Sequence, residues 1–227
     1  MLFSIEKKYV FVPANLVYFK SDWCTNDFSD TTGLASGNNI EEAILHAMCE
    51  VIERHVEDLV CWNRIKVPTV DIATISTHDT KKIINHLSSI GLKLKFSYLN
   101  IGFNIPVIRV FAYLEKTQVY PSSYSFYTSV GAHPNKDIAM LRALTEFAQT
   151  RASIFYKFKN KFDKITFCKQ MPRHIFDFFS ETIDNKRIGF DEVQSHSNND
   201  ILSDINLIIK ILDKNGHEVI IKDLTHP

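Results

Sequence analysis

The sequence predicts an α+β fold in which a mixed, mostly antiparallel sheet packs against long helices. Two long segments have helical periodicity, and between them lie short segments rich in β-branched and aromatic residues. Two of these short segments are close enough in sequence to form a hairpin, which favours antiparallel pairing. The 227 residues are 45% hydrophobic, enough to bury the core of a single domain over residues 1–227.

The N-terminal segment is predicted to contain short strands followed by a loop. Apolar runs at Tyr9–Val12 and Leu16–Phe19 stand on either side of Pro13. Residues 21–38 are rich in Ser, Thr, Asp, Asn and Gly, a composition typical of a loop. The loop ends in GLASGNN, residues 33–39, and leads directly into the first long helix. Backbone amides at such a helix start can receive an anion.

The first long helix is predicted from Ile40 to Leu59. Asn38 or Asn39 can cap it, and Glu41 and Glu42 suit the positive end of its dipole. On a wheel of about 100° per residue, apolar residues cover a broad arc, so we expect the helix to be largely buried. The remaining sector carries a polar row made of Glu42, His46, Glu50 and Glu53, with Arg54 at its margin.

The carboxylates of this row have two interpretations. Like charges at helical spacing destabilise a helix by a few tenths of a kcal/mol per pair in water, and by more where solvent is excluded. A solvated acidic face is the commoner reason for such a run. The alternative is that Glu42, Glu50 and Glu53 hold Mg²⁺, which prefers oxygen ligands and often binds together with phosphates. Zinc is disfavoured because no Cys/His ligand spacing occurs, and His46 alone is more often a satisfied polar residue.

The middle of the chain is predicted to contain a helix and three strands. Asp79–Leu92 has helical periodicity and reaches its end at Gly91, and Leu92–Leu99 alternates as a strand does. Val107–Leu114 and Gln118–Tyr127 are rich in β-branched and aromatic residues. The three residues between them are predicted to form the turn of a hairpin.

The second long helix is predicted from Asn135 to about Lys157. Arg142, Glu146 and Gln149 share one narrow sector of its wheel, whereas Arg151 falls among apolar residues. An unpaired buried guanidinium is unfavourable. Arg151 therefore either extends past the helix end to solvent or pairs with a carboxylate or a phosphate.

The C-terminal part is predicted to be mainly helical before a final strand. Phe155–Phe167 is basic and aromatic, and a solvated helix end or loop is favoured over a nucleic-acid contact. Arg173–Arg187 is predicted to be helical. Ile201–Asn215 is a well-patterned helix, and Glu218–Leu224 is predicted to be a strand.

Composition narrows the function classes. The 26 basic and 26 acidic residues balance, so the sequence shows no footprint for nucleic acid or an anionic membrane. No apolar run of about 18 residues and no signal-peptide pattern occurs, and we expect a cytoplasmic protein. Four scattered cysteines argue against a disulfide scaffold, and the absence of GxGxxG and GxxxxGK[ST] argues against a Rossmann turn or a P-loop.

Four stretches of the sequence resemble the YcaO family: FVPANLVYF, GLASGNNIEEAILHAMCEVIER, SVGAHPNKDIAMLRALTEFAQTR and EVIIKDLTHP. The resemblance implies a YcaO-like ATP-binding fold and an enzyme that uses ATP and Mg²⁺ to phosphorylate a peptide backbone amide. A Cys, Ser or Thr side chain as nucleophile then gives an azoline ring by cyclodehydration, and external sulfide gives a thioamide. Substrates of this kind are ribosomally made peptides or proteins.

The resemblance also assigns residues, although it identifies no catalytic residue beyond the ligand contacts. Ala35 and His46 stand where relatives carry Ser and Gln, and Glu146 and Gln149 belong to the second long motif without an assigned role. Glu42, Glu50 and Glu53 stand at magnesium positions. The implied ATP contacts are Asn38, Glu42, His46, Glu50, Glu53, Arg54 and Arg151.

Members of the family usually carry an earlier copy of the glutamate-rich helix and a further C-terminal tail. This sequence has one copy, so we expect residues 1–227 to form a partial YcaO-like domain, incomplete at both ends. One hypothesis is an enzyme, active alone or together with another subunit; the alternative is a degenerate or truncated module that acts as a non-catalytic binding or scaffold subunit. The expected partners are a substrate peptide or protein, a TfuA-type or E1-like peptide-recognition protein, a complementing YcaO fragment, or a second copy in a homodimer.

Overall fold

The computed structural model describes residues 2–4, 10–14, 17, 31–114, 126–159, 182–196 and 200–225. The chain forms two compact units, one of Met1–Val51 with Asn198–Pro227 and one of Ile52–Ser197. Helix α1 (Ile40–Trp62) is continuous and contributes residues to both units. The prediction of one domain over residues 1–227 stays a prediction.

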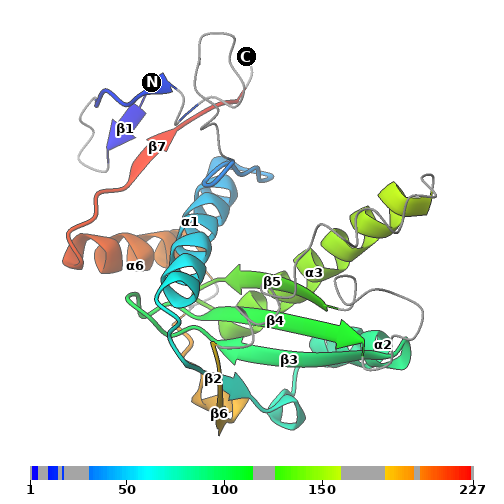
Figure 1. The fold of residues 1–227 in the computed structure, drawn as a ribbon. Helices are drawn as coiled ribbons and strands as arrows, with labels where there is room; N and C mark the ends of the chain where they lie inside the picture. The colour runs from blue at the N-terminus through cyan, green and yellow to red at the C-terminus, as the bar shows by residue number, and fades with distance from the viewer. Residues whose placement is uncertain are drawn as a thin grey trace. The chain divides into compact units, whose positions relative to one another are not determined.

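The larger unit is built on a five-stranded sheet with the strand order β5-β4-β3-β2-β6 (Figure 1). The pairs β2–β3, β3–β4 and β4–β5 are antiparallel, and β2–β6 is parallel. The prediction of a mixed, mostly antiparallel sheet is therefore confirmed. The strands are β2 (Val67–Val70), β3 (Leu92–Tyr98), β4 (Val107–Leu114), β5 (Phe126–Ala132) and β6 (Ile183–Ile188).

Helices α2 (His78–Ser89) and α3 (Lys136–Lys159) lie on the same side of this sheet (Figure 1). Alternate β4 residues Ile108 and Val110 enter one hydrophobic core with side chains of both helices. Arg109 lies between them in sequence and therefore points to the opposite face. There its guanidinium contacts Cys61 near the end of α1, so the last turns of α1 lie on that second face.

Strand β5 and helix α3 approach each other unusually closely at Gly131. A Cβ atom at Gly131 would lie 2.4 Å from both the Ala139 carbonyl oxygen and the Ala143 nitrogen. The Ser129 hydroxyl donates to the Ala143 carbonyl oxygen at 2.6 Å. Only glycine permits this distance between the backbones, and the close packing fixes how the polar side of α3 stands relative to the end of β5.

The smaller unit contains helix α6 (Ile201–Lys214) and an antiparallel pair formed by β1 (Leu2–Ser4) and β7 (Ile220–Lys222). The Asp200 side chain caps α6 by accepting from the Ser203 N–H at 2.9 Å. The capped, strongly apolar pattern explains why this helix was predictable from sequence. No described helix is long and apolar enough to cross a membrane.

Two parts of the sheet differ from the sequence predictions. The prediction of a helix at Arg173–Arg187 is wrong for the residues that are described, because residues 183–188 form strand β6. Consecutive polar residues of β6 are exposed at the sheet edge, so the sequence lacks the alternation of polar and apolar residues that predicts a strand. Strand β2, which contains Pro68, was not predicted from the sequence. The register with β6 shifts between Val67 and Thr69, so the proline stands at a bulge, where its missing N–H is tolerated.

Other predictions fall partly outside the described residues. Of the second hairpin strand predicted at Gln118–Tyr127, only Phe126 and Tyr127 are described, and both lie in β5, which ends at Ala132. The predicted turn and most of the basic segment after Lys159 lie outside the described residues, as do most residues of the two N-terminal strands. Val10–Pro13 is described and is not a strand.

Candidate functional site

The loop before α1 folds back onto the first half of the helix. The Gly33 N–H donates to Glu50 Oε2 at 2.9 Å, which connects the start of the loop to the third turn of α1. A Cβ atom at Gly37 would lie 2.6 Å from both the Ala43 nitrogen and the Glu42 Cβ. The segment GLASGNN therefore makes a tight backbone turn over the helix start, as its composition predicts.

Asn39 is the helix cap, because its Oδ1 accepts from the Glu42 N–H at 2.8 Å. Asn38 has a different role. Its backbone N–H and its Nδ2 both donate to Glu42 Oε2, at 2.8 and 2.9 Å. The contact between Asn38 and Glu42 holds the first carboxylate of the row in one orientation beside the loop.

His46 and Ala35 are the two positions where the sequence departs from the family pattern. His46 is exposed, and its Nδ1 lies 3.3 Å from the Ser36 carbonyl oxygen. Ala35 is partly buried and brings no polar atom beyond its backbone. The loop thus retains its form at these positions without a hydroxyl or an amide side chain there.

Glu53 is the buried member of the row, with only 4% of its surface exposed. Its Oε2 accepts from the Ala132 N–H at 3.1 Å, which joins α1 to the last residue of β5. Burial, and then the charge of Glu146, raise the pKa of Glu53 to about 8. Arg142, the Ala132 N–H and Arg54 oppose this rise.

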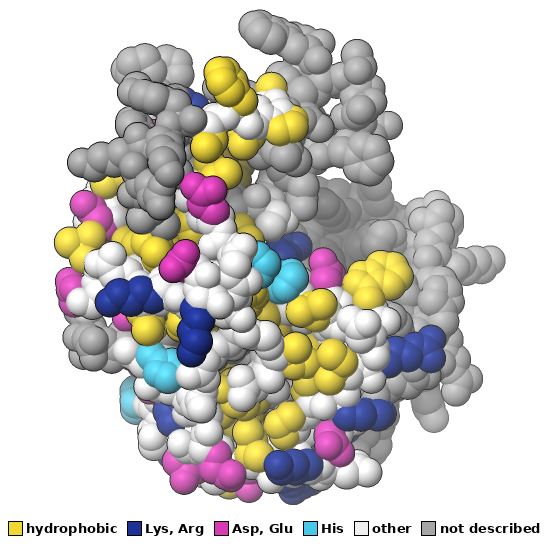
Figure 2. Space-filling view, turned by 90° about the vertical axis from the view of Figure 1, so that its left-hand side faces the viewer, with side chains coloured by type: hydrophobic (Ala, Val, Ile, Leu, Met, Phe, Trp, Pro, Cys, Tyr) yellow, Lys and Arg dark blue, Asp and Glu magenta, His cyan; other side chains and the backbone are white. Residues whose placement is uncertain are grey.

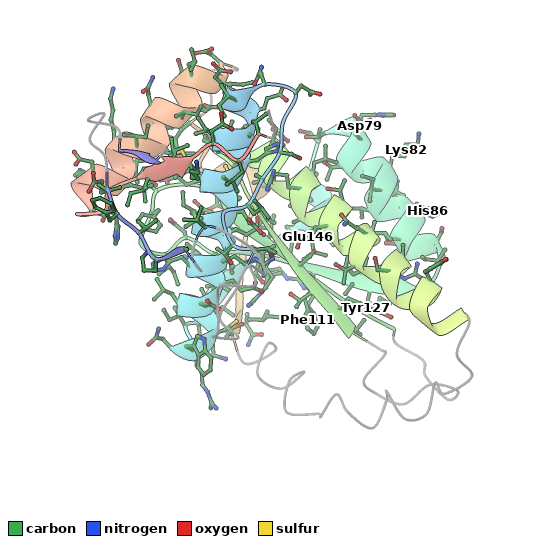
Figure 3. The ribbon with its side chains drawn as sticks, turned by 90° about the horizontal axis from the view of Figure 1, so that it is seen from above. Asp79, Lys82, His86, Phe111, Tyr127 and Glu146 are labelled. Atoms are coloured by element: carbon green, nitrogen blue, oxygen red, sulfur yellow. The ribbon has the colours of Figure 1, made fainter. Side chains whose placement is uncertain are left out.

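Helix α3 therefore contributes a second group of charges beside Glu53. Arg142 and Glu146 are one turn apart on this helix and both act on the Glu53 carboxyl group. Glu146 is labelled on α3 in Figure 3. The sequence identified Glu146 without a role and did not identify Arg142 as a site residue. Arg142 and Glu146 lie in the same sector of the helical wheel, and this shared position could have identified Arg142 as a candidate.

The remaining residues of the second motif lie farther along α3. Gln149 is exposed, and Arg151 is half-buried. Burial raises the pKa of Tyr127, and the charge of Arg151 opposes that rise, so Arg151 lies near the phenol of Tyr127. Tyr127 is labelled in Figure 3. The predicted contact of Arg151 with a phosphate stays a prediction.

Half-buried Glu57 and fully buried Arg109 form a polar cluster that was not predicted from the sequence. Glu57 follows Glu53 by one turn, and burial raises its pKa to about 7 against the charges of Arg109 and Arg54. The Arg109 guanidinium is fully buried and donates to Thr182 Oγ1 at 2.6 Å and to Cys61 Sγ at 3.8 Å. The i+4 spacing of Glu57 from Glu53 was the available signal.

The donor chemistry of α1 fits Mg²⁺, because Glu42, Glu50 and Glu53 supply carboxylate oxygens. Among the described residues, no group of three or more His, Cys, Asp or Glu side chains is arranged to hold a metal ion. Magnesium usually takes one or two protein carboxylates and completes its shell with phosphate oxygens and waters. The joint assignment of Glu42, Glu50 and Glu53 to magnesium therefore stays a prediction.

One face of the molecule carries described charges of both signs. On the face seen in Figure 2, acidic and basic side chains are interspersed among hydrophobic ones. Asp79, Lys82 and His86 follow one another along α2 (Figure 3), and all three are exposed. A mixed, solvated stripe of this kind is ordinary for a surface helix.

Residues 4–227 match the protein family described as "YcaO cyclodehydratase, ATP- and Mg²⁺-binding". An uncharacterized protein of Methanothermobacter thermautotrophicus is 31% identical over 94% of this chain and 57% of its own length. The chain therefore spans little more than half of that relative.

Two solved structures show the same fold. A heterocyclase in complex with substrate and cofactor aligns with a TM-score of 0.83 and 22% identity, covering 100% of this chain and 30% of that one. The structure of YcaO from Methanopyrus kandleri, bound with AMPPCP and Mg²⁺, aligns with a TM-score of 0.74 and 20% identity, covering 95% of this chain and 56% of that one. At these identities the likeness establishes the fold.

Proposed function

The chain belongs to the YcaO family, and we propose that it takes part in the ATP- and Mg²⁺-dependent activation of a peptide backbone amide. The products would be azoline heterocycles, by cyclodehydration of Cys, Ser or Thr residues, or thioamides. ATP and Mg²⁺ are the ligands of this family. A heterocyclase with the same fold was solved in complex with substrate and cofactor, which supports the binding of a substrate and a cofactor by this chain as well.

Glu53 is the observation that carries this proposal. A glutamate that is 4% exposed, with a second carboxylate nearby, is unfavourable for folding. Its neighbours only partly offset the rise in its pKa to about 8. Carboxyl groups with strongly shifted pKa values are common at sites where a bound ligand stabilises the charged form. A divalent cation does this, because metal coordination requires the deprotonated carboxylate.

The residues of the chain have distinct roles in this proposal. Glu42, Glu50 and Glu53 would hold magnesium, and Asn38, His46, Arg54 and Arg151 would contact the nucleotide. When bound, MgATP supplies the phosphoryl group that activates the amide oxygen. The Ala132 N–H fixes the orientation of Glu53, and Asn38 fixes that of Glu42, so both carboxylates are positioned before any ligand arrives.

We expect MgATP to raise the melting temperature of the protein through ligand linkage. At a ligand concentration about 100 times Kd, the stabilisation is about 2.7 kcal/mol. The double variant Glu50→Gln with Glu53→Gln should abolish the rise, because both changes remove carboxylate ligands and keep side-chain volume. Thermal denaturation with and without millimolar MgATP measures this.

The matched control is Glu41→Gln, which removes one charge from the first turn of α1 outside the polar row. This variant should retain the full rise. If wild-type protein shows no rise at millimolar MgATP, the chain alone does not bind the nucleotide and the proposed function of this chain by itself is wrong.

A non-catalytic binding or scaffold role is the second candidate. One observation favours it: Ala35 and His46 stand where relatives carry Ser and Gln, so two of the contacts that the resemblance implies lack the usual side chain. A chain that binds MgATP without hydrolysing it, with or without added peptide, would support this role. Single-domain organisation, a TfuA-type or E1-like partner, a complementing YcaO fragment and a homodimer remain proposals, and light scattering of the purified protein tests the last of these.

A further inference from the structure

Three polar side chains of α1 follow one another at intervals of four residues on the side of the helix that faces the sheet. They are Glu53, Glu57 and Cys61, and all three belong to the larger unit. Glu53 and Cys61 are buried, and Glu57 is half-buried. A helix that only had to attach to a sheet would carry apolar residues at such positions. This inner row of polar side chains therefore needs an explanation.

The two ends of the inner row are held by different strands. Glu53 Oε2 accepts from the Ala132 N–H of β5 at 3.1 Å. Two turns later, Cys61 Sγ accepts from the Arg109 guanidinium of β4 at 3.8 Å. The two contacts are separated by eight residues, about 12 Å along the helix axis. Because hydrogen bonds are directional, two of them at this separation fix the rotation of the second half of α1 about its axis.

Arg109 is itself held by the residue that precedes β6. Its guanidinium donates to Thr182 Oγ1 at 2.6 Å, and the Thr182 carbonyl oxygen accepts from the Val67 N–H of β2 at 3.0 Å. Arg109 and Thr182 are both fully buried. Glu57, in the middle of the inner row, is attracted by the charge of Arg109. A single guanidinium thus connects the second half of α1 with β4 and with the start of β6.

Stability alone does not explain a buried arginine at this place. Removing a guanidinium and a carboxylate from water opposes folding, and apolar side chains of similar volume in their place are often as stable or more so. The same turns of α1 already carry Ile52, Val56 and Val60, which are at most 2% exposed. The burial of these residues attaches the helix, but hydrophobic contact is non-directional. Arg109 adds the direction.

We propose that Arg109 is a positioning residue, which fixes the rotation of the second half of α1 and thereby keeps the Glu53 carboxylate on the Ala132 N–H, in the orientation that receives the ligand. The inference rests on the proposed function for that ligand. Arg109 acts through α1, since two helical turns separate its contact at Cys61 from Glu53. Without the guanidinium these turns keep their apolar contacts but rotate more freely, so the bond between Ala132 and Glu53 opens more often.

The test replaces Arg109 with methionine, alone and together with Glu57→Leu. The double variant removes both charges and keeps an apolar interior, so it should fold even if the single change does not. Hydrogen exchange resolved to single residues then compares two amides at the end of β5. Ala132 donates to Glu53, whereas His133 donates to the Pro106 carbonyl oxygen. We expect the Ala132 amide of the double variant to exchange about tenfold faster and the His133 rate to change by less than about twofold.

Isothermal titration with MgATP is the second measurement, and the Kd of the double variant should rise about tenfold. Arg187→Met is the matched control, because Arg187 is an exposed arginine on β6. This variant should change neither the exchange rates nor the Kd.

Three results would overturn the inference: an unchanged Ala132 rate, equal acceleration of the Ala132 and His133 amides, or a faster Ala132 amide with an unchanged Kd for MgATP. Equal acceleration would show that Arg109 serves only the stability of the whole fold. The exchange experiment needs no nucleotide. If wild-type protein fails to bind MgATP, the proposed function is wrong, and the exchange rates still decide whether Arg109 holds Glu53 in place.

Discussion

Gly131→Ala is expected to destabilise the protein by about 3 kcal/mol, near the upper end for overpacking in a core. The added methyl would lie 2.4 Å from the Ala139 oxygen and the Ala143 nitrogen. Both are backbone atoms of α3, so no side chain can rotate away. The helix must move off β5, which also weakens the bond from the Ser129 hydroxyl to the Ala143 carbonyl oxygen. Urea denaturation measures the change in the free energy of unfolding.

Gly102→Ala separates this steric effect from simple loss of a glycine. Gly102 has a φ of +78°, but a Cβ there would meet nothing within 4 Å. Its replacement should therefore lower stability only by the backbone strain, about 1 kcal/mol. If the two variants lose the same stability, the close approach of β5 and α3 is not what requires glycine at position 131.

Glu53→Gln is expected to stabilise the metal-free protein at pH 8 and above and to flatten the dependence of its stability on pH. The ordinary pKa of 4.5 applies in the unfolded chain, whereas the folded pKa is about 8. Between these values the folded state holds the proton more tightly. Stability is therefore greatest at low pH and falls as pH rises toward 8, by an amount on the order of 3 to 5 kcal/mol.

Glutamine removes this loss because it never ionises, and its amide oxygen can still accept from the Ala132 N–H. The measurement is urea denaturation at a series of pH values with a chelator present. Some decline should remain in the variant, since burial also raises the pKa of Glu57, to about 7. Parallel curves for wild-type protein and Glu53→Gln would contradict the raised pKa of Glu53. Excess Mg²⁺ with nucleotide should favour the wild-type carboxylate instead.

The elements that sequence predicted well are those specified by local signals. α1, α2, α3 and α6 each combine helical periodicity with a cap or a terminal glycine, and their observed bounds differ from the predicted ones by a few residues. β3 and β4 alternate clearly and were also predicted. Where the chain's own residues set the conformation, the pattern was sufficient.

The elements that sequence missed depend on distant partners. Strand β2 pairs with β6, and the Thr69 hydroxyl donates to the Asp184 carbonyl oxygen across 115 positions of sequence. The sequence around Pro68 does not indicate this pairing, because a proline normally argues against a strand and is tolerated here only by the irregular register. The exposed polar residues of β6 do not alternate with apolar ones, so that strand could not be predicted from its own residues either. Long-range pairing therefore overrides weak local preference at both places.

In the candidate site, too, local signals could be read from the sequence and tertiary contacts could not. The polar row of α1 was readable because helical spacing alone places Glu42, His46, Glu50 and Glu53 in one sector. The charges that meet Glu53 from α3 could not be deduced, since the approach of α3 to β5 depends on tertiary packing at Gly131. Glu57 was missed although it continues the row, because its burial beside Arg109 is also a tertiary property.

The hydrogen bond from Ala132 to Glu53 gives the protein a natural spectroscopic reporter. An amide proton that faces a carboxylate resonates at a different frequency when that carboxylate gains a proton or binds a cation. The ¹H–¹⁵N signal of Ala132 should therefore follow the state of Glu53 without any added label, and a titration with acid or with magnesium salt would display both events on a single residue.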